Sequence, residues 1–368
     1  MKIGILTQPL ATNYGGLLQA YALQKILSEK GHDVTIIQRE KNSVYYKILR
    51  KIKALVCKNY TYMSSKTIHY VSQEIDKFIN NNIVNRTKKI NSTKALIREI
   101  NKYNFDAYVV GSDQVWRPSY SPNIYNYYLD FIEEKAVKKI AYAASFGVEQ
   151  WEYTVKETKR CAELAKSFDL ISVREDSGIN LCGNYLGVNA IHVLDPTMLL
   201  PKNDYIDIIR QEYKDWDDNL CFNENLFCYF LDSNVEKEAL ANKIANVYSL
   251  SLLFSMPKKY KGGNLNNENI YPSVSFWLSC FVKSSYVLTD SFHGCVFSII
   301  FNKPFWVILN PNRGNSRFTS LLKLFGLENR IVKDFNITQW DSDISWNLVN
   351  DKLSILRKRS LDFIFRLL

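Results

Sequence analysis

The first 37 residues constrain the fold more than any other part of this chain. They contain a short apolar run, a turn-rich loop, an amphipathic segment and a second apolar run, which read KIGIL, TQPLATNYGG, LLQAYALQKILSEKG and DVTII. Ala20, Leu23 and Leu27 fall on one face of a helix, and Gly31 stands where that helix would end. This order predicts a strand–helix–strand unit and therefore a mostly parallel sheet.

Later apolar runs repeat the pattern, and each leads into a polar loop. The pairs are DAYVV with GSDQVWR, KIAYAA with SFG, DLISV with REDSG, and IHVL with DPT. After Asp195 a charged stretch precedes a second set of strands, which includes LFCYFLD, YVLTD and FWVIL. Ligands of open α/β sheets bind at the carboxyl ends of the strands, so we expect the site in these loops.

We therefore predict an α/β protein with two Rossmann-like domains that face each other across a cleft. The first domain covers residues 1–198 and carries a basic, helical insertion at about 40–105. The second covers 199–345, and a C-terminal helix in 346–368 packs back on the first domain.

The charge of the chain indicates anionic partners. Net charge is +10, and seven basic residues lie between Arg39 and Lys58 against Glu40 alone. No nucleic-acid-binding motif accompanies them, so we expect no nucleic-acid partner. Residues 45–58 alternate apolar and basic groups, and two interpretations stay open: a helix on a membrane surface, or a solvated helix that packs its apolar side inward.

Compartment and metal content follow from what the sequence contains. No run reaches the ~18 apolar residues of a membrane span, and the start lacks the features of a secretory signal. The seven cysteines are scattered without a C-x-x-C pair, which is typical of reduced thiols in a cytoplasmic protein. We expect no metal site.

The sequence TDSFHG at 289–294 is the strongest candidate for chemistry. It follows an apolar run and precedes another, so it lies where a strand ends and a helix begins. The backbone at a helix start attracts anions, and a histidine there can bind phosphate or transfer a proton. We expect contributions from His293, with Asp290, Ser291 and Gly294 beside it; the alternative is a capped helix with a structural histidine.

Three other loops supply candidates. NYGG offers Asn13, Gly15 and Gly16 at a helix start, although a tight turn would also need glycine. GSDQVWR offers Asp113 as a base, Trp116 to stack on a sugar and Arg117 to grip an anion; the alternative is a capping aspartate and a core tryptophan. Arg174 fits an anion clamp or a surface ion pair. We also expect substrate contacts from Gln19, Ser112, Gln114, Ser145, Lys303, Arg313 and Arg317.

Taken together, these segments resemble the polysaccharide pyruvyl transferases. The resemblance runs through NYGG, GSDQVW, SFG, SVREDSG, LDPT, TDSFHG and FNKPF, over most of residues 1–310. It implies a fold like the GT-B glycosyltransferases, with His293 as the catalytic or phosphate-binding histidine and Arg174 as the family's arginine. This chain departs from the family pattern at one position, since members often have arginine where it has Ser291. We therefore expect either that Arg313, Arg317 or Lys303 binds the phosphate, or that this chain uses another donor.

The resemblance also implies the reaction. Members transfer the enolpyruvyl group of phosphoenolpyruvate to sugar hydroxyls and form a pyruvate ketal, with no metal or redox cofactor. The acceptor is a sugar or lipid-linked oligosaccharide at the inner face of the membrane. Two alternatives stay open: a nucleotide-sugar-dependent glycosyltransferase of GT-B-like fold, and a non-catalytic sugar-binding protein. The sequence has no G-x-S-x-G, P-loop or H-E-x-x-H motif that would favour other hydrolase or nucleotidase chemistry.

Overall fold

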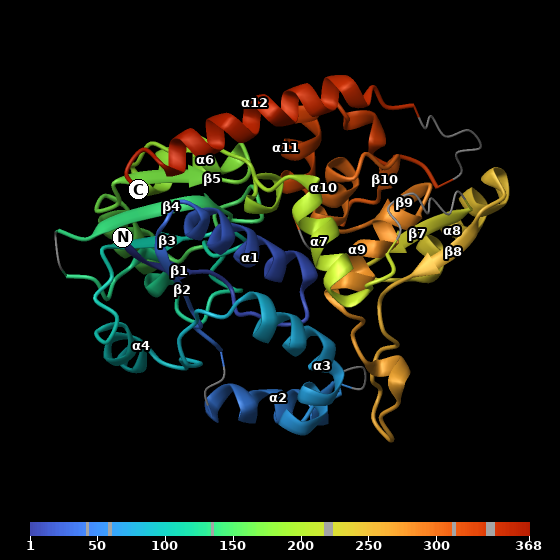
Figure 1. The fold of residues 1–368 in the computed structure, drawn as a ribbon. Helices are drawn as coiled ribbons and strands as arrows, with labels where there is room; N and C mark the ends of the chain where they lie inside the picture. The colour runs from blue at the N-terminus through green and yellow to red at the C-terminus, as the bar shows by residue number, and fades with distance from the viewer. Residues whose placement is uncertain (42–43, 58–60, 134–135, 217–223, 311–313, 336–342) are drawn as a thin grey trace.

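The computed structural model describes residues 1–368 except 42–43, 58–60, 134–135, 217–223, 311–313 and 336–342. Two parallel β-sheets form the centres of two lobes (Figure 1). The first sheet has the strand order β2-β1-β3-β4-β5-β6. Its strands are β1 (Lys2–Leu6), β2 (Asp33–Ile37), β3 (Ala107–Val110), β4 (Lys138–Ala144), β5 (Leu170–Val173) and β6 (Ile191–His192).

The second sheet repeats the plan with fewer strands. Its order is β10-β9-β7-β8, and all its neighbouring strands are parallel. The strands are β7 (Asn225–Tyr229), β8 (Ser251–Phe254), β9 (Tyr286–Thr289) and β10 (Phe305–Val307). In each sheet the chain runs outward from the first strand to one side and then returns to the other side. The strand order therefore reverses between β1 and β3 and between β7 and β9, which is where open α/β sheets bind ligands.

The first helix forms as its sequence indicates. Helix α1 (Tyr14–Glu29) begins at Asn13, whose side chain accepts a hydrogen bond from the Gly16 N–H at 3.2 Å. Its predicted apolar face, Ala20, Leu23 and Leu27, is fully buried. Gly31 follows the helix with φ +85°, the left-handed conformation that glycine adopts at a helix end.

The remaining helices cover the sheets and fill the connections. The insertion between β2 and β3 holds α2 (Val44–Val56), α3 (Ser65–Asn82) and α4 (Thr93–Ile100). The first lobe continues with α5 (Val155–Ala165) and α6 (Ser177–Leu181). The rest are α7 (Lys202–Glu212), α8 (Val235–Tyr248), α9 (Val274–Lys283), α10 (Phe292–Ile300), α11 (Ser316–Phe325) and α12 (Trp346–Ile364).

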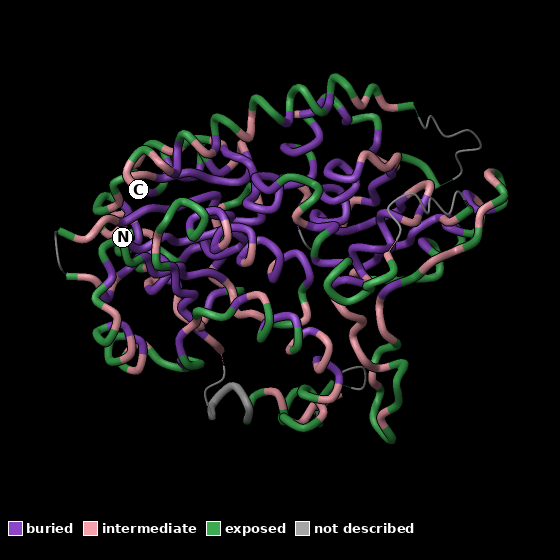
Figure 2. The backbone as a smooth tube through the Cα atoms, viewed as in Figure 1, coloured by how far each residue is buried: buried purple, intermediate pink, exposed green. Residues whose placement is uncertain are grey.

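The two lobes share one apolar core (Figure 2). Tyr14, on α1, stacks on Trp277 of α9 with ring centroids 5.2 Å apart, and its hydroxyl donates to the Pro272 carbonyl at 2.8 Å. Helix α12 runs from the second lobe to the first (Figure 1). Arg357 donates to the Met198 carbonyl, and Ser360 accepts from the Leu194 N–H, at 2.8 and 3.0 Å. These contacts fix the two sheets relative to each other.

Two general features complete the fold. None of the helices in the described ranges is both long and apolar enough to span a bilayer. The six cysteines that the structure describes are all free thiols.

Candidate active site between the two sheets

A cavity of about 370 Å³ lies between the lobes at the carboxyl ends of both sheets. The reversal points of the two sheets both contribute to its wall, so residues far apart in the chain meet there. The first lobe lines it with Gln8, Pro9, Ala11, Asn13, Gly16, Lys41, Asp113, Gln114 and Tyr120, and the second with Leu231, Asp290, Ser291, Phe292, His293, Arg317 and Phe318.

Two helices begin at this cavity. Asn13 caps α1, and Ser291 caps α10 by accepting a hydrogen bond from the Gly294 N–H at 3.4 Å. Backbone N–H groups and the partial positive charge of a helix start favour bound anions. Because one such helix comes from each lobe, the cavity suits a ligand with two anionic groups.

His293 lies between these helix starts. It is the second residue of α10 and is 5% exposed. A β-carbon at Gly15 would lie only 2.0 Å from the imidazole Cγ and Nδ1, so glycine is needed for α1 to approach the ring. The imidazole Nε2 is 3.7 Å from Asp195 Oδ2 and has no hydrogen-bond partner among the described residues. Packing thus holds the imidazole in place, while its Nε2 has no hydrogen bond among the described residues.

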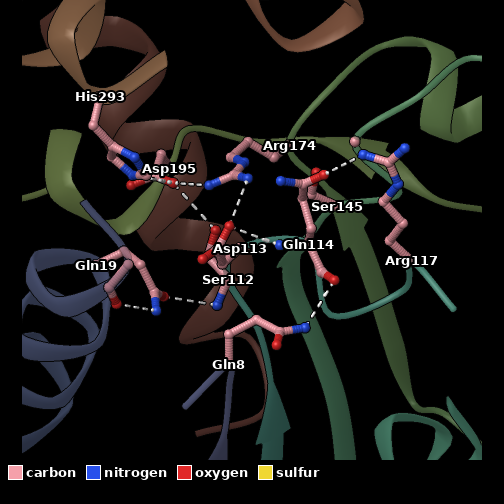
Figure 3. A network of polar contacts seen from close by, with 12 residues as sticks. Gln8, Gln19, Ser112, Asp113, Gln114, Arg117, Ser145, Arg174, Asp195 and His293 are labelled. Atoms are coloured by element: carbon pink, nitrogen blue, oxygen red, sulfur yellow. Dashed lines mark hydrogen bonds and ion pairs between the residues drawn. The ribbon is translucent and has the colours of Figure 1, made fainter. Parts of the chain in front are cut away.

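A buried charge network lies behind the histidine (Figure 3). Arg174 contacts Asp195 at 2.7 Å and Asp113 at 3.5 Å. Asp195 also accepts hydrogen bonds from the hydroxyls of Ser112 and Thr197, at 3.2 and 2.7 Å. Burial by itself would raise the pKa of Asp195, but His293 and Arg174 together hold it well below the usual range. Asp195 is therefore an anion that faces the imidazole of His293.

Asp113 joins this network to the cavity. Its Oδ1 accepts from the Gln114 N–H at 2.8 Å, while a β-carbon at Gly16 would lie 3.0 Å from Oδ2. Its backbone has φ +70°, which is costly for a residue other than glycine and is most common at functional sites. The strained conformation aims one carboxylate oxygen toward the start of α1, at the cavity wall.

Phe292 brings two cations from different lobes together. The Arg174 guanidinium lies 4.7 Å from the ring centroid and the Arg317 guanidinium 5.7 Å. Burial and, next, the charge of Arg174 lower the pKa of Arg317 to about 10. Like charges this close repel each other, and an anion in the cavity would relieve that repulsion.

Several predicted site residues support the cavity from behind. Gln19 donates to Thr7 and accepts from the Ser112 N–H, so it links α1 to the loop after β3. Ser145 donates to the buried Glu175 at 3.0 Å. Gly294 lies against Thr289, where a β-carbon would be 2.2 Å from the hydroxyl. The Asp290 carboxylate is occupied by Lys237 and by two backbone N–H groups.

Two expected substrate contacts, at Trp116 and Lys303, are wrong. Trp116 is fully buried, stacks on Tyr128 and donates to the Tyr127 carbonyl, so it cannot meet a sugar. Arg117 does not itself line the cavity: it binds Glu152 through two hydrogen bonds of 3.0 Å and contacts the cavity residues Gln114 and Tyr120. Lys303 follows α10 and so lies at the amino end of β10, where it donates to the Val282 carbonyl. Arg313 lies outside the described residues.

The sequence analysis missed Asp195, Phe292 and Gln8. Asp195 carried a usable signal, since it ends an apolar run in IHVLDPT as the other candidates do. Phe292 lies inside TDSFHG, but its contact with both arginines depends on two other elements. Gln8 donates to the Gln114 carbonyl at 2.9 Å and lines the cavity beside it.

A second cavity of about 560 Å³ lies in the first lobe, next to the cavity between the lobes. Lys41 lines both cavities, and its ammonium donates to the Ser119 carbonyl at 2.7 Å. The wall combines amide and hydroxyl side chains, such as Asn91, Thr93 and Asn123, with the charged side chains of Arg39, Glu40 and Glu157.

Comparison with solved structures shows the fold. A UDP-GlcNAc 2-epimerase from Methanocaldococcus jannaschii has 12% identity and a TM-score of 0.50, over 97% of this chain and 93% of that one. UGT89C1 of Arabidopsis thaliana, complexed with UDP-L-rhamnose, has 11% identity and a TM-score of 0.49, over 99% and 95%. The predicted two-lobed, GT-B-like α/β fold is confirmed.

Comparison by sequence shows the family. Curated proteins contain no match to this chain. Residues 13–312, however, match the family described as polysaccharide pyruvyl transferase, a range that reaches into both lobes and includes His293, while Gln8 and Arg317 of the cavity wall lie outside it. The chain is therefore a transferase that belongs to the polysaccharide pyruvyl transferase family.

Proposed function

We propose that the protein transfers the enolpyruvyl group of phosphoenolpyruvate to two hydroxyls of a sugar and forms a pyruvate ketal. One observation carries this proposal: His293 and Arg317 of the second lobe line, with Asp113 of the first lobe, a cavity where two helices begin, and Arg174 lies buried behind it. Phosphoenolpyruvate has a phosphate and a carboxylate, and each can take one helix start. Family members often have an arginine at the position of Ser291, and in this proposal Arg317 takes over its role of binding the phosphate.

The reaction assigns a role to each group. His293, protonated and held beside Asp195, gives a proton to the methylene carbon, and Asp113 receives the proton of the first sugar hydroxyl as its oxygen attacks the adjacent carbon. The C–O bond to phosphate then breaks, and the second hydroxyl closes the ketal. The two sugar hydroxyls release two protons. One of them reprotonates His293, and the other leaves with the phosphate. No step requires a metal or redox cofactor.

The acceptor in this proposal is a sugar or a lipid-linked oligosaccharide. The second cavity supports it, because amide and hydroxyl side chains suit sugar hydroxyls and Lys41 connects the two cavities. The place of action is the cytoplasm, at the inner face of the membrane, with contact through residues 45–58.

The test is a transfer assay with phosphoenolpyruvate and a panel of glycans. It measures the phosphate that is released and the acid-labile ketal that is formed. We expect both products with the wild type, in equal amounts. The second measurement is the thermal unfolding temperature in the presence of phosphoenolpyruvate or of UDP-sugars. Stabilisation by UDP-sugars and none by phosphoenolpyruvate would overturn the proposal and favour a nucleotide-sugar-dependent glycosyltransferase.

A further inference from the structure

Helix α2 exposes the face that a surface helix normally buries. Ile48, Leu49, Ile52, Leu55 and Val56 fall on one side of the helix, and all are exposed, with Leu55 at 87% and Val56 at 76%. The neighbouring helix α3 behaves in the ordinary way, since its apolar residues Val71, Ile75 and Phe78 are buried. The apolar side of α2 therefore lacks a cover in the part of the chain that the structure describes.

The charge of α2 indicates what covers it. Its sequence, VYYKILRKIKALV, contains four basic residues and no acidic one. Arg50, Lys51 and Lys53 lie beside or opposite the apolar stripe. An apolar stripe flanked by cations is typical of a helix that lies at a lipid–water interface and is attracted by anionic lipids. A protein partner would have to match the stripe in shape, whereas a lipid surface need not.

The second lobe adds cations on the same side of the molecule. The segment between β8 and α9 projects beyond the body in the same direction as α2 (Figure 1). It carries Lys258, Lys259 and Lys261, all exposed, of which Lys258 pairs with Glu268 at 2.8 Å, and Figure 2 shows the segment mostly as exposed backbone. Its later part is attached to α3, because the Tyr271 N–H donates to the Val71 carbonyl at 2.8 Å. Basic residues of both lobes thus lie on the side of the molecule from which α2 projects (Figure 1).

Helix α2 follows a cavity residue closely in the sequence. Lys41 lines the cavity between the lobes, and α2 begins three residues later at Val44. A bilayer in contact with α2 would therefore hold a membrane-borne substrate near the cavity.

We propose that α2 and the lysines of residues 258–261 dock the protein on an anionic lipid bilayer. The partner is the lipid surface itself, recognised by the apolar stripe and by the lysine and arginine side chains. This inference rests on the proposed function in one respect: it names the membrane as the place where a lipid-linked acceptor is met.

Sedimentation with vesicles tests the docking without any turnover. We expect the wild type to bind phosphatidylcholine vesicles that contain phosphatidylglycerol, to bind pure phosphatidylcholine at least about tenfold more weakly, and to be released by salt. The double variants Ile52→Ser/Leu55→Ser and Lys51→Glu/Lys53→Glu should each weaken binding by about tenfold or more. Leu348→Ser/Ile355→Ser, at exposed apolar positions of α12, is the matched control and should bind like the wild type.

Three outcomes would overturn the inference: no binding to anionic vesicles, equal loss in the α12 control, or a wild-type dimer that the α2 variants dissociate. The last would make the stripe a contact between two copies. Thermal unfolding establishes that each variant is folded. Transfer to a soluble sugar should be unchanged in the α2 variants, so a failure of docking and a failure of the proposed function are read separately.

Discussion

The two lobes have the same strand order around their first strands, but they hold their charged groups differently. In the first lobe Arg174 is clamped between Asp195 and Asp113, and Asp195 is satisfied by two hydroxyls as well. In the second lobe the His293 Nε2 lies 3.7 Å from Asp195, beyond hydrogen-bond distance, and has no hydrogen-bond partner among the described residues.

This difference separates two tasks. Removal of either partner of a buried ion pair is costly, because it leaves an uncompensated charge. A buried nitrogen without a hydrogen-bond partner costs free energy until a ligand satisfies it, so it is available to a ligand. We interpret the first lobe as the support that sets electrostatics and the second lobe as the source of the reacting group. The predictions below test this division.

The largest effect is expected at His293. His293→Ala should lower the rate of the proposed transfer by about 10²–10⁴-fold, because the acid is lost. The free energy of unfolding should also fall, because the buried imidazole leaves a cavity, but by less than the loss in rate corresponds to. Phosphate release under single-turnover conditions and urea denaturation measure the two quantities. His69→Ala, at an exposed position, is the control, and a full rate in His293→Ala would remove the second lobe from the chemistry.

The matching change in the first lobe should act mainly on stability. Asp195→Ala leaves Arg174 buried without its closest counter-charge, so we expect a loss of about 3 kcal/mol in the free energy of unfolding. Asp207→Ala removes only an exposed ion pair with Arg210 and should cost less than about 1 kcal/mol. Equal losses in the two variants, measured by urea denaturation, would contradict the idea that the first lobe is the rigid support.

Gly15 tests the contact between the lobes. Gly15→Ala places a β-carbon 2.0 Å from the imidazole, so the ring or α1 must move. A shift of about 1 Å in a catalytic group can cost about 10²-fold in rate, and we expect a loss of that order in transfer. Gly183→Ala, where an added β-carbon meets nothing within 4 Å, should retain the wild-type rate. A wild-type rate in Gly15→Ala would mean that the position of His293 does not matter.

The smallest effect is a dependence of stability on pH. Because the pKa of Asp195 is held below that of an ordinary aspartate (about 3.9), the unfolded chain binds a proton there that the folded chain does not. Acidification below about pH 4 should therefore destabilise the protein, by up to about 1.4 kcal/mol per pH unit from this group. Denaturation of the wild type and of Asp195→Asn at several pH values checks this, and identical slopes would contradict it.

The sequence predicted the backbone well and the side-chain directions poorly. The start of α10 beside His293 and the cap of α1 at Asn13 follow from short-range signals, and both are present. Trp116 and Arg117 follow a strand just as Asp113 does, yet one enters the core and the other turns toward Glu152. Nothing in GSDQVWR distinguishes these three directions.

Lys303 and Asp195 illustrate errors that chain position alone could have prevented. Lys303 comes after a helix and before a strand, so it had to lie at the amino edge of the sheet, away from ligands. Asp195 ends a strand-like run and had the same claim to the site as Arg174. Phe292 could not be recognised in this way, because its contacts with Arg174 and Arg317 join three separate elements.

By itself the sequence determined the alternation of strands and helices, the two-lobed architecture and the loops at the carboxyl edges. These depend on periodicity, caps and turns, which act within a few residues. Only the tertiary structure decided that His293 meets Asp195 and Gly15, that Arg317 joins Arg174 at one ring, and that α2 turns its apolar side outward. Such contacts depend on how the two lobes and the insertion pack against each other, which sums many weak interactions across distant parts of the chain.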